Sequence, residues 1–112
     1  MYDAMKSIEI EKVQLALDGY VGSVCYIHLE TTQGAYVNRP TGAFIRNAQV
    51  QIERVQIRGT DPFRVGLKIP LGWIYAEGLN VYDQDEQGRL LLEGHDADGK
   101  LQVALHLSLQ PL

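Results

Sequence analysis

The strongest constraint on this chain is a period-two alternation of apolar and polar residues that recurs along most of its length. It is cleanest over residues 63–69, where Phe, Val, Leu and Ile alternate with Arg, Gly and Lys, and over residues 101–109, where every second residue is Leu or Val. Successive side chains of a β-strand point to opposite faces of a sheet, so this alternation is typical of strands with one buried face. The sequence therefore predicts a mainly β protein.

One helix is expected before the alternation begins, at residues 7–18. Ser7 is a suitable N-cap, apolar residues follow it at helical spacing, and Gly19 provides a stop. Strands are expected over residues 24–109, separated by turns that contain Gly and Pro. The apolar phase of the long strand in the middle of the chain changes near residue 53, which predicts a bulge or a sharp bend there.

The connections between the expected strands are short. Short connections join antiparallel neighbours, because parallel pairing needs a long crossover, so residues 43–109 are expected to form an antiparallel meander. A short strand at 35–37 and a loop at 38–42 are expected to precede it. A meander curled into a small barrel or a sandwich, with the helix over one end, hides its apolar faces best. The length of 112 residues suits a single β domain over residues 1–112.

The composition favours a soluble cytosolic protein. The hydrophobic fraction of 46% and the charged fraction of 21% are ordinary for a globular domain. Cys25 is the single cysteine, which excludes an intrachain disulfide and is typical of a reducing compartment. No stretch has the pattern of a signal peptide or of a membrane span. We therefore expect a cytoplasmic location and no membrane partner.

The charge is unevenly distributed along the chain. Residues 39–68 hold six of the ten basic residues against two acidic ones, a local charge of +4 that leaves −8 on the rest. The basic segment predicts either an anion site or strands that pair with acidic neighbours. A single-stranded nucleic-acid site needs aromatic residues interleaved with a basic groove. The net charge of −4 disfavours such a partner, so no nucleic acid is expected.

The best-known catalytic motifs are missing from the sequence. It has no glycine-rich phosphate loop, nucleophile elbow, Cys-x-x-Cys or His-Glu-x-x-His pattern. Residues 83–88 resemble the start of a calcium loop, but Gly94 occupies the position of its closing glutamate, so a solvated hairpin loop is favoured. Cys25 falls on an apolar face and is not proposed as a nucleophile.

The three histidines raise the question of a metal site. Together with two nearby carboxylates they offer ligands that suit zinc or iron, if the sheet brings them together. Their spacing does not match the short patterns of known metal sites. We therefore predict no metal and no cofactor. The residues concerned are His28, His95, His106, Glu30 and Asp96.

Arg46 and Glu77 interrupt two apolar phases of the expected strands. If these phases face inward, both charges are buried and need a partner. A structural ion pair, or a position at the domain rim, is favoured. The alternative is a small-anion pocket in which Arg46 binds a carboxylate or phosphate, with His28 and Glu30 as acid and base at its mouth. The candidate ligand-binding residues are thus Arg46, Glu77, His28 and Glu30, and no catalytic residue is assigned.

Four segments resemble one known family. They are His28–Tyr36 (HLETTQGAY), Gly42–Val50 (GAFIRNAQV), Gly72–Leu79 (GWIYAEGL) and Leu91–Asp96 (LLEGHD). The chain resembles the YojF-like family of small bacterial proteins of unknown function. The resemblance implies no reaction and no catalytic residue. It implies a context, since such proteins tend to be encoded beside a deacetylase used in making a low-molecular-weight bacterial thiol.

Two classes of function follow from these observations. The favoured one is a non-catalytic accessory or interaction protein, because catalytic motifs are missing and apolar strand faces are abundant. The family resemblance implies that a thiol deacetylase could be its partner. Self-association is also expected, with a homodimer as the default. The alternative is a small-anion-binding protein or enzyme with a pocket around Arg46 and Glu77.

Overall fold

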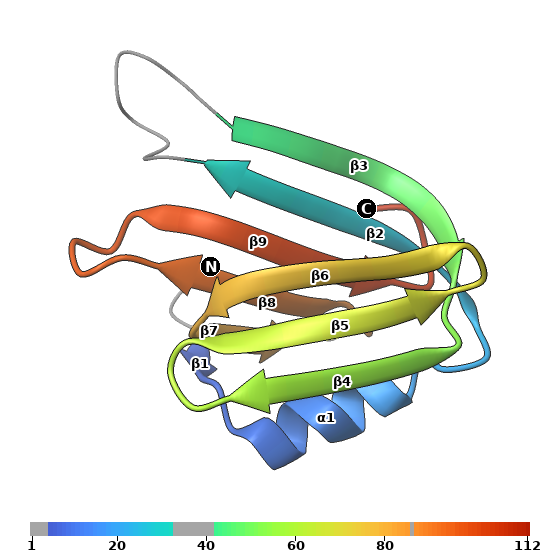
Figure 1. Ribbon diagram of the computed structural model, residues 1–112, viewed down its shortest axis with the longest axis horizontal. Coiled ribbons are helices and arrows are strands. Elements are labelled where there is room, and N and C mark those ends of the chain that lie inside the picture. Colours follow the sequence, from blue (N-terminus) through green and yellow to red (C-terminus); the bar gives the residue numbers. More distant parts are fainter. Residues whose placement is uncertain (1–4, 33–41, 86) are drawn as a thin grey trace.

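The protein is built from two antiparallel β-sheets that face each other, with one helix packed at their lower edge in the view of Figure 1. The computed structural model describes residues 5–32, 42–85 and 87–112. One sheet has six strands in the order β1-β7-β8-β9-β2-β3, and the other has three in the order β4-β5-β6. Along the chain the described elements are β1 (Lys6–Ser7), α1 (Ile10–Asp18), β2 (Val24–Thr32), β3 (Gly42–Gln51), β4 (Arg54–Gly59), β5 (Phe63–Ile69), β6 (Gly72–Leu79), β7 (Val81–Gln84), β8 (Leu90–His95) and β9 (Leu101–Ser108).

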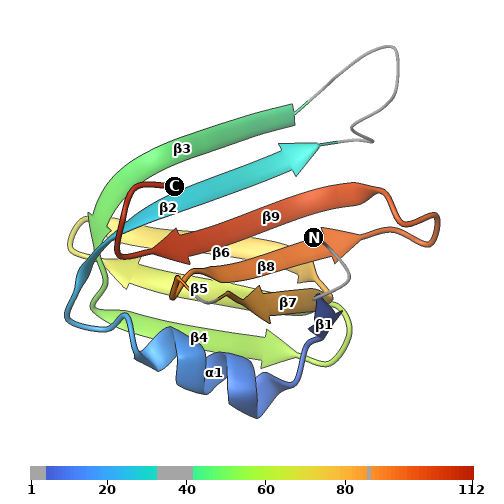
Figure 2. The ribbon, with the colours of Figure 1, turned by 180° about the vertical axis from the view of Figure 1, so that it is seen from behind.

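The predicted antiparallel meander is present, but it is divided between the two sheets. Hairpins join β4, β5 and β6 in one sheet and β7, β8 and β9 in the other. The chain crosses between the sheets at residues 52–53 and again at Asn80. The first crossing lies where the sequence predicted a bend. Seen from behind, β2 and β3 extend beyond the smaller sheet and the two sheets do not close into a barrel (Figure 2). Of the two predicted forms, the structure is therefore the open sandwich.

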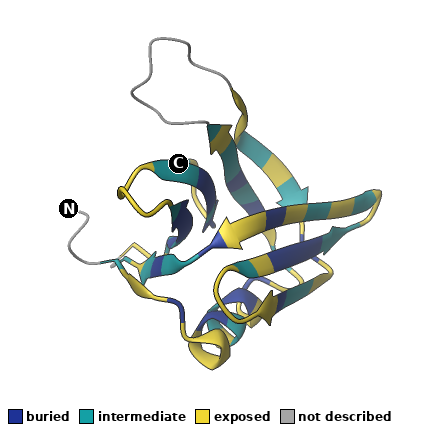
Figure 3. Ribbon diagram, turned by 60° about the vertical axis from the view of Figure 1, so that its left-hand side comes forward, coloured by how far each residue is buried: buried dark blue, intermediate teal, exposed yellow. Residues whose placement is uncertain are grey.

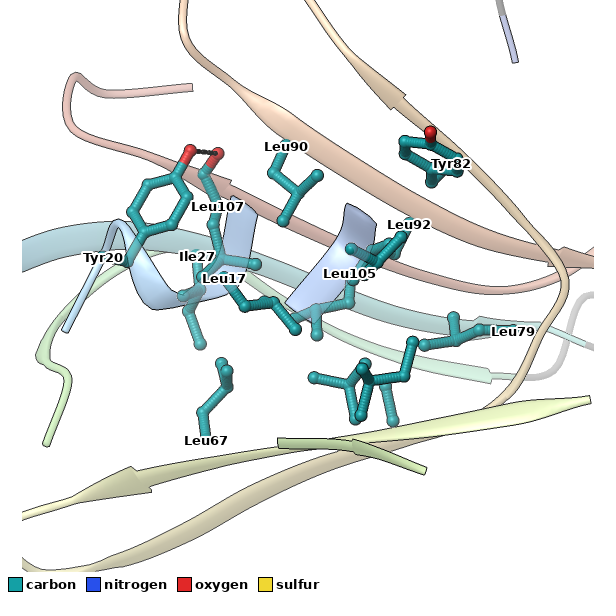
Figure 4. Packing of buried hydrophobic residues seen from close by; sticks show 14 of the residues in the cluster. Leu17, Tyr20, Ile27, Leu67, Leu79, Tyr82, Leu90, Leu92, Leu105 and Leu107 are labelled. Carbon is teal, nitrogen blue, oxygen red and sulfur yellow. Dashed lines mark hydrogen bonds between the residues drawn. The ribbon is translucent and has the colours of Figure 1, made fainter. Parts of the chain in front are cut away.

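One apolar core holds the helix and both sheets together. Leu17 of α1, Ile27 of β2, Leu67 of β5 and Leu105 of β9 are fully buried and point into the space between the sheets (Figure 4). Complete burial of such a side chain contributes about 1.5–3 kcal/mol. Less exposed and exposed positions alternate along most of β6, whereas β5, β8 and β9 each bury three consecutive residues (Figure 3). Polar residues of the strands therefore occupy the two outer faces.

The ends of the expected elements needed two corrections. Ser7 does not cap the helix, because it lies in β1 and pairs with Val81 of β7. Glu9 is the N-cap residue instead, with no side-chain hydrogen bond, and the helix begins at Ile10. Gly19 follows the last helical turn as predicted. The strand expected at 35–37 and most of the loop at 38–42 lie outside the described residues.

The helix α1 has nine residues. Among the residues that the structure describes, there is no helix of the length and apolarity required to span a membrane.

A bulge at Asn47 sets which residues of β3 face the core. Ile27 of β2 lies opposite Ala48, whereas the next residue, His28, lies opposite Arg46. Asn47 is therefore the extra residue, and its φ of 54° is one that asparagine tolerates. Because one extra residue reverses the alternation, Ala48 packs against the core while Arg46 moves to the outer face.

The side chain of Asn47 also fixes the last residue. Its Nδ2 donates a hydrogen bond to the Leu112 carbonyl oxygen at 3.0 Å, and its Oδ1 accepts one from the Leu112 N–H at 2.6 Å. The amide thus holds Leu112 beside Arg46 on the outer face of the sheet.

Replacing Asn47 tests the bulge. Asn47→Ala loses both hydrogen bonds and places a Cβ residue without local hydrogen bonding at positive φ, so unfolding should become easier by about 1–3 kcal/mol in urea titrations. Asn47→Gly loses the same hydrogen bonds but accepts the backbone angle, so its loss should be smaller. Equal losses in the two variants would show that the backbone angle is not a constraint.

Candidate functional site

Two neighbouring rows of side chains cross the outer face of the six-stranded sheet. Residues directly opposite each other on antiparallel strands share a face, so the pairing identifies each row. The first row runs through Arg46, His28, His106 and Leu91 on β3, β2, β9 and β8. The second runs through Phe44, Glu30, Ala104 and Glu93 on the same four strands. The ionisable side chains of these two rows therefore lie close together on the same face of the sheet.

Glu93 is the centre of this arrangement. Its side chain is only 7% exposed, although it is charged. Its Oε1 accepts a hydrogen bond from His95 Nε2 at 3.0 Å, and its Oε2 accepts one from His106 Nε2 at 3.1 Å. A buried carboxylate is tolerated when hydrogen-bond donors compensate for the lost hydration. Two imidazoles provide that compensation here.

His95 has acceptors on both sides of its ring. Nδ1 lies 3.1 Å from the Gly99 carbonyl oxygen, and Nε2 lies 3.0 Å from the Glu93 carboxylate. Only the imidazolium form can donate from both nitrogens. Burial lowers the pKa of His95, but the hydrogen bonds to Gly99 and Glu93 outweigh burial, and the net pKa is raised above 6.5.

The pKa of Glu93 moves in the opposite direction. The hydrogen bond from His106 is the largest influence and lowers it, burial opposes this, and the bond from His95 lowers it further. The net pKa lies below the ordinary value of 4.5. The lowered pKa favours the ionised form of Glu93, and the raised pKa of His95 favours the imidazolium beside it.

A second carboxylate–histidine pair lies beside the first. His28 Nε2 is 3.0 Å from Glu30 Oε1, and the His28 ring lies 5.6 Å from the His106 ring, centroid to centroid. The pairs Glu30–His28 and His106–Glu93 thus form a continuous line across β2, β9 and β8.

An open pocket of about 300 Å³ lies over these rows. Leu91 and Leu112 supply its apolar walls, and the remaining lining is ionisable. The Arg89 guanidinium pairs with Asp85, whereas Arg46 packs over the Phe44 ring at 5.7 Å and has no ion-pair partner among the described residues. The full lining is His28, Arg46, Arg89, Leu91, Glu93, His106 and Leu112.

The structure brings together three of the four candidate residues from the sequence. His28, Glu30 and Arg46 share the outer face of the six-stranded sheet. Glu77 lies on β6 of the other sheet, opposite Arg64, so the ion pair with Arg46, which was one of the two favoured interpretations, is not formed. Both side chains are exposed.

The expectation for Glu77 assumed the wrong face of β6. Ile74 and Ala76 face the core, which leaves Glu77 outside with Trp73 and Tyr75. Aromatic residues on an outer face do not reveal their direction by alternation alone. When both alternating series of residues in a strand contain apolar side chains, tertiary packing decides which series faces the core.

Sequence reasoning missed Glu93 and Arg89. One signal for Glu93 was present: a carboxylate following the apolar run Leu90–Leu92, with His95 two positions later on the same face of the strand. Arg89 follows residues 83–88, for which a solvated hairpin loop was favoured, and it was expected at the start of a strand, whereas β8 begins at Leu90. In the structure Asp85 closes that loop by accepting hydrogen bonds from Gln87 and Arg89.

The histidines are arranged around carboxylates as hydrogen-bond donors. In the described parts of the chain, no cluster of three or more His, Cys, Asp or Glu side chains has the arrangement of a metal site. Asp96 accepts bonds from Asp98 N–H and Lys100 N–H and holds the β8–β9 turn. Burial raises the pKa of the Cys25 thiol to about 11, which makes it a weak nucleophile.

Comparison with known proteins identifies the family. A family model described as a protein of unknown function, DUF1806, matches residues 7–112. The chain belongs to the DUF1806 family. It is 48% identical to the uncharacterised protein YojF of Bacillus subtilis over 96% of this chain and 97% of that one. The crystal structure of Bacillus subtilis YojF aligns with a TM-score of 0.87 at 47% identity and covers 97% of both chains. The YojF-like resemblance of the four sequence segments is confirmed.

The opposite pKa shifts of His95 and Glu93 predict an optimum in stability. A raised pKa contributes stability below the unfolded-state value near 6.5 and loses it as the pH rises through the folded-state pKa. A lowered pKa contributes stability above 4.5 and loses it as the pH falls through the folded-state pKa. The free energy of unfolding of this DUF1806 protein should therefore decline on both sides of the interval between these values.

Urea unfolding at a series of pH values measures this dependence. His95→Gln should flatten the alkaline decline more than the acid decline, because His106 still bonds Glu93 in the variant. Parallel pH profiles for the variant and the parent protein would contradict the assigned protonation of His95.

Proposed function

We propose that this DUF1806 protein is a non-catalytic accessory protein that binds a small carboxylate or phosphate anion in the outer-face pocket. The observation that carries the proposal is the charge balance of the pocket. Glu93 is compensated by His95 and His106, and Arg89 by Asp85, which leaves Arg46 as the uncompensated charge among the described lining residues. An anion would complete the balance.

The pocket chemistry supports this ligand class. A guanidinium can form two parallel hydrogen bonds to a carboxylate or phosphate, which gives both affinity and orientation. Phe44 packs against the Arg46 guanidinium and limits its freedom before binding. The imidazoles of His28 on β2 and His106 on β9 use Nε2 to bond Glu30 and Glu93, which leaves their Nδ1 atoms for contact with a ligand.

The Glu93–His106 hydrogen bond favours a second candidate, in which the same pocket performs acid–base catalysis. A carboxylate bonded to one ring nitrogen orients an imidazole and leaves the other nitrogen to accept a proton. Hydrolysis of p-nitrophenyl acetate or p-nitrophenyl phosphate that disappears in His106→Gln, while anion binding persists, would favour catalysis. Absence of hydrolysis with both esters would favour binding alone.

We propose that the protein acts beside a thiol deacetylase, which is the context that the family resemblance implies. We also propose that it forms a homodimer, because symmetric self-association is the default for soluble oligomers. Light scattering of the purified protein, alone and mixed with such a deacetylase, measures both associations directly.

Arg46→Gln tests the proposed pocket. Isothermal titration with inorganic phosphate and with malonate should show binding to the parent protein and at least about a tenfold weaker constant for the variant, because a hydrogen bond to a charged group contributes about 1.5–3 kcal/mol. Lys100→Gln is the matched control, since it removes one positive charge from the exposed β8–β9 turn.

The variants should fold equally well, because both side chains are exposed. Thermal unfolding without ligand checks this point. Binding that is unaffected by Arg46→Gln, or the failure of both anions to bind the parent protein at millimolar concentrations, would overturn the proposal.

A further inference from the structure

The outer face of the three-stranded sheet carries four basic and two aromatic residues in a regular array. Strand pairing gives three rows of directly opposed residues. We call this the basic aromatic face. Its rows are Arg54, Lys68 and Trp73; Gln56, Gly66 and Tyr75; and Arg58, Arg64 and Glu77. It lies on the opposite side of the core from the pocket proposed above.

The aromatic rings of this face form an exposed platform. Trp73 is 41% and Tyr75 53% exposed, and their rings are stacked with centroids 5.6 Å apart and planes 10° from parallel. The platform depends on Gly66, since a Cβ at that position would lie 2.9 Å from the Tyr75 ring. Arg54 lies over Trp73 at 5.8 Å and Arg64 over Tyr75 at 5.9 Å. These contacts hold two guanidinium groups beside the rings.

The same sheet places like charges directly opposite each other at two positions. Arg58 pairs with Arg64, and Arg54 pairs with Lys68. Like charges in such positions destabilise a sheet. Lys68 forms an ion pair with Glu53, with Nζ 3.4 Å from Oε1. Arg54 and Arg58 form no ion pair with any described residue. Glu77 lies opposite Arg64 on its other side and offsets part of this repulsion, and an anionic partner would relieve the rest.

We propose that the basic aromatic face binds single-stranded nucleic acid. Bases stack on Trp73 and Tyr75, and phosphates contact the arginines, which is how sheet surfaces bind single strands with little sequence preference. A hollow of about 210 Å³ lies between the rings and the arginines and admits a base or phosphate. Its lining is Gln56, Arg58, Arg64, Gly66, Trp73 and Tyr75.

Other occupants fit these observations less well. A second copy of this chain that docked symmetrically through the same face would oppose arginine to arginine. An acidic protein surface would neutralise the arginines but would not require an exposed stacked pair of rings. The net charge of −4 disfavoured nucleic acid in the sequence, but the structure concentrates Arg54, Arg58, Arg64 and Lys68 on one face. Local charge, rather than net charge, governs the contact.

Trp73 provides a direct readout because it is the single tryptophan of the chain. Titration of the full-length protein with a ten-nucleotide oligothymidylate should quench its fluorescence. Affinity should fall with salt, with a slope of about −2 to −3 in log K against log salt concentration for four neutralised phosphates. Tyr75→Leu should weaken binding at least about fivefold, the lower end of the effect of losing one stacked base.

Arg58→Gln distinguishes an effect on oligonucleotide binding from an effect on protein stability. It should weaken oligonucleotide binding and reduce the magnitude of the salt slope by about 0.7. Because it also removes the repulsion with Arg64, it should raise Tm by about 1–5 °C. Lys100→Gln, on the other sheet, should change neither the affinity nor the salt slope.

Substitution of a residue with a purely structural role would not weaken oligonucleotide binding and raise Tm at the same time. Unchanged Trp73 fluorescence at millimolar oligothymidylate would overturn the proposal. So would binding of adenosine monophosphate or of polyglutamate as tightly as the oligonucleotide, since either result would show that a single nucleotide or charge alone is sufficient.

Discussion

The single apolar core between the two sheets determines which faces carry the charged side chains of the described strands. α1 contributes Val13 and Leu17 to this core, and strands of both sheets contribute the rest. Because the inner faces are filled by aliphatic side chains, ionisable residues of the strands occupy the outer faces. The chain passes from one sheet to the other at residues 52–53 and at Asn80, so each outer face is assembled from its own part of the sequence. Two chemically different surfaces result.

The charged side chains of the two outer faces differ in how far they are paired with opposite charges. On the six-stranded sheet, the Glu93 carboxylate is surrounded by imidazole donors, and compensation leaves Arg46 as the group available to an anion. On the three-stranded sheet, Arg58 faces Arg64, and Glu77 on the other side of Arg64 offsets only part of the positive charge of this face. Because pairing on the six-stranded sheet leaves Arg46 as the single unpaired group among the described pocket residues, this face favours a small ligand in a defined pocket. An excess of positive charge beside stacked rings favours an extended polyanion.

The alternation of residues predicted most of the fold, because side-chain direction in a strand is a local property. It predicted the strands and the change of phase near residue 53, while helical spacing predicted a helix over residues 7–18 and the short connections predicted antiparallel hairpins. It failed at the helix cap, where Ser7 pairs with Val81 instead, and it left barrel and sandwich open. For the candidate site it found His28, Glu30 and Arg46, but it paired Arg46 with Glu77 and missed Glu93 and Arg89.

The sequence by itself determined the secondary structure, the antiparallel pairing and the family. Only the tertiary structure decided which charges meet, because register is a property of the whole sheet. One extra residue at Asn47 in β3, and another at Gly78 in β6, reverses every side chain beyond it. The bulge at Asn47 turns Arg46 toward His28, and core packing of Ile74 and Ala76 turns Glu77 away from it. Alternation along one strand contains no information about its neighbour's register, so the sites could be assigned only after the sheets were assembled.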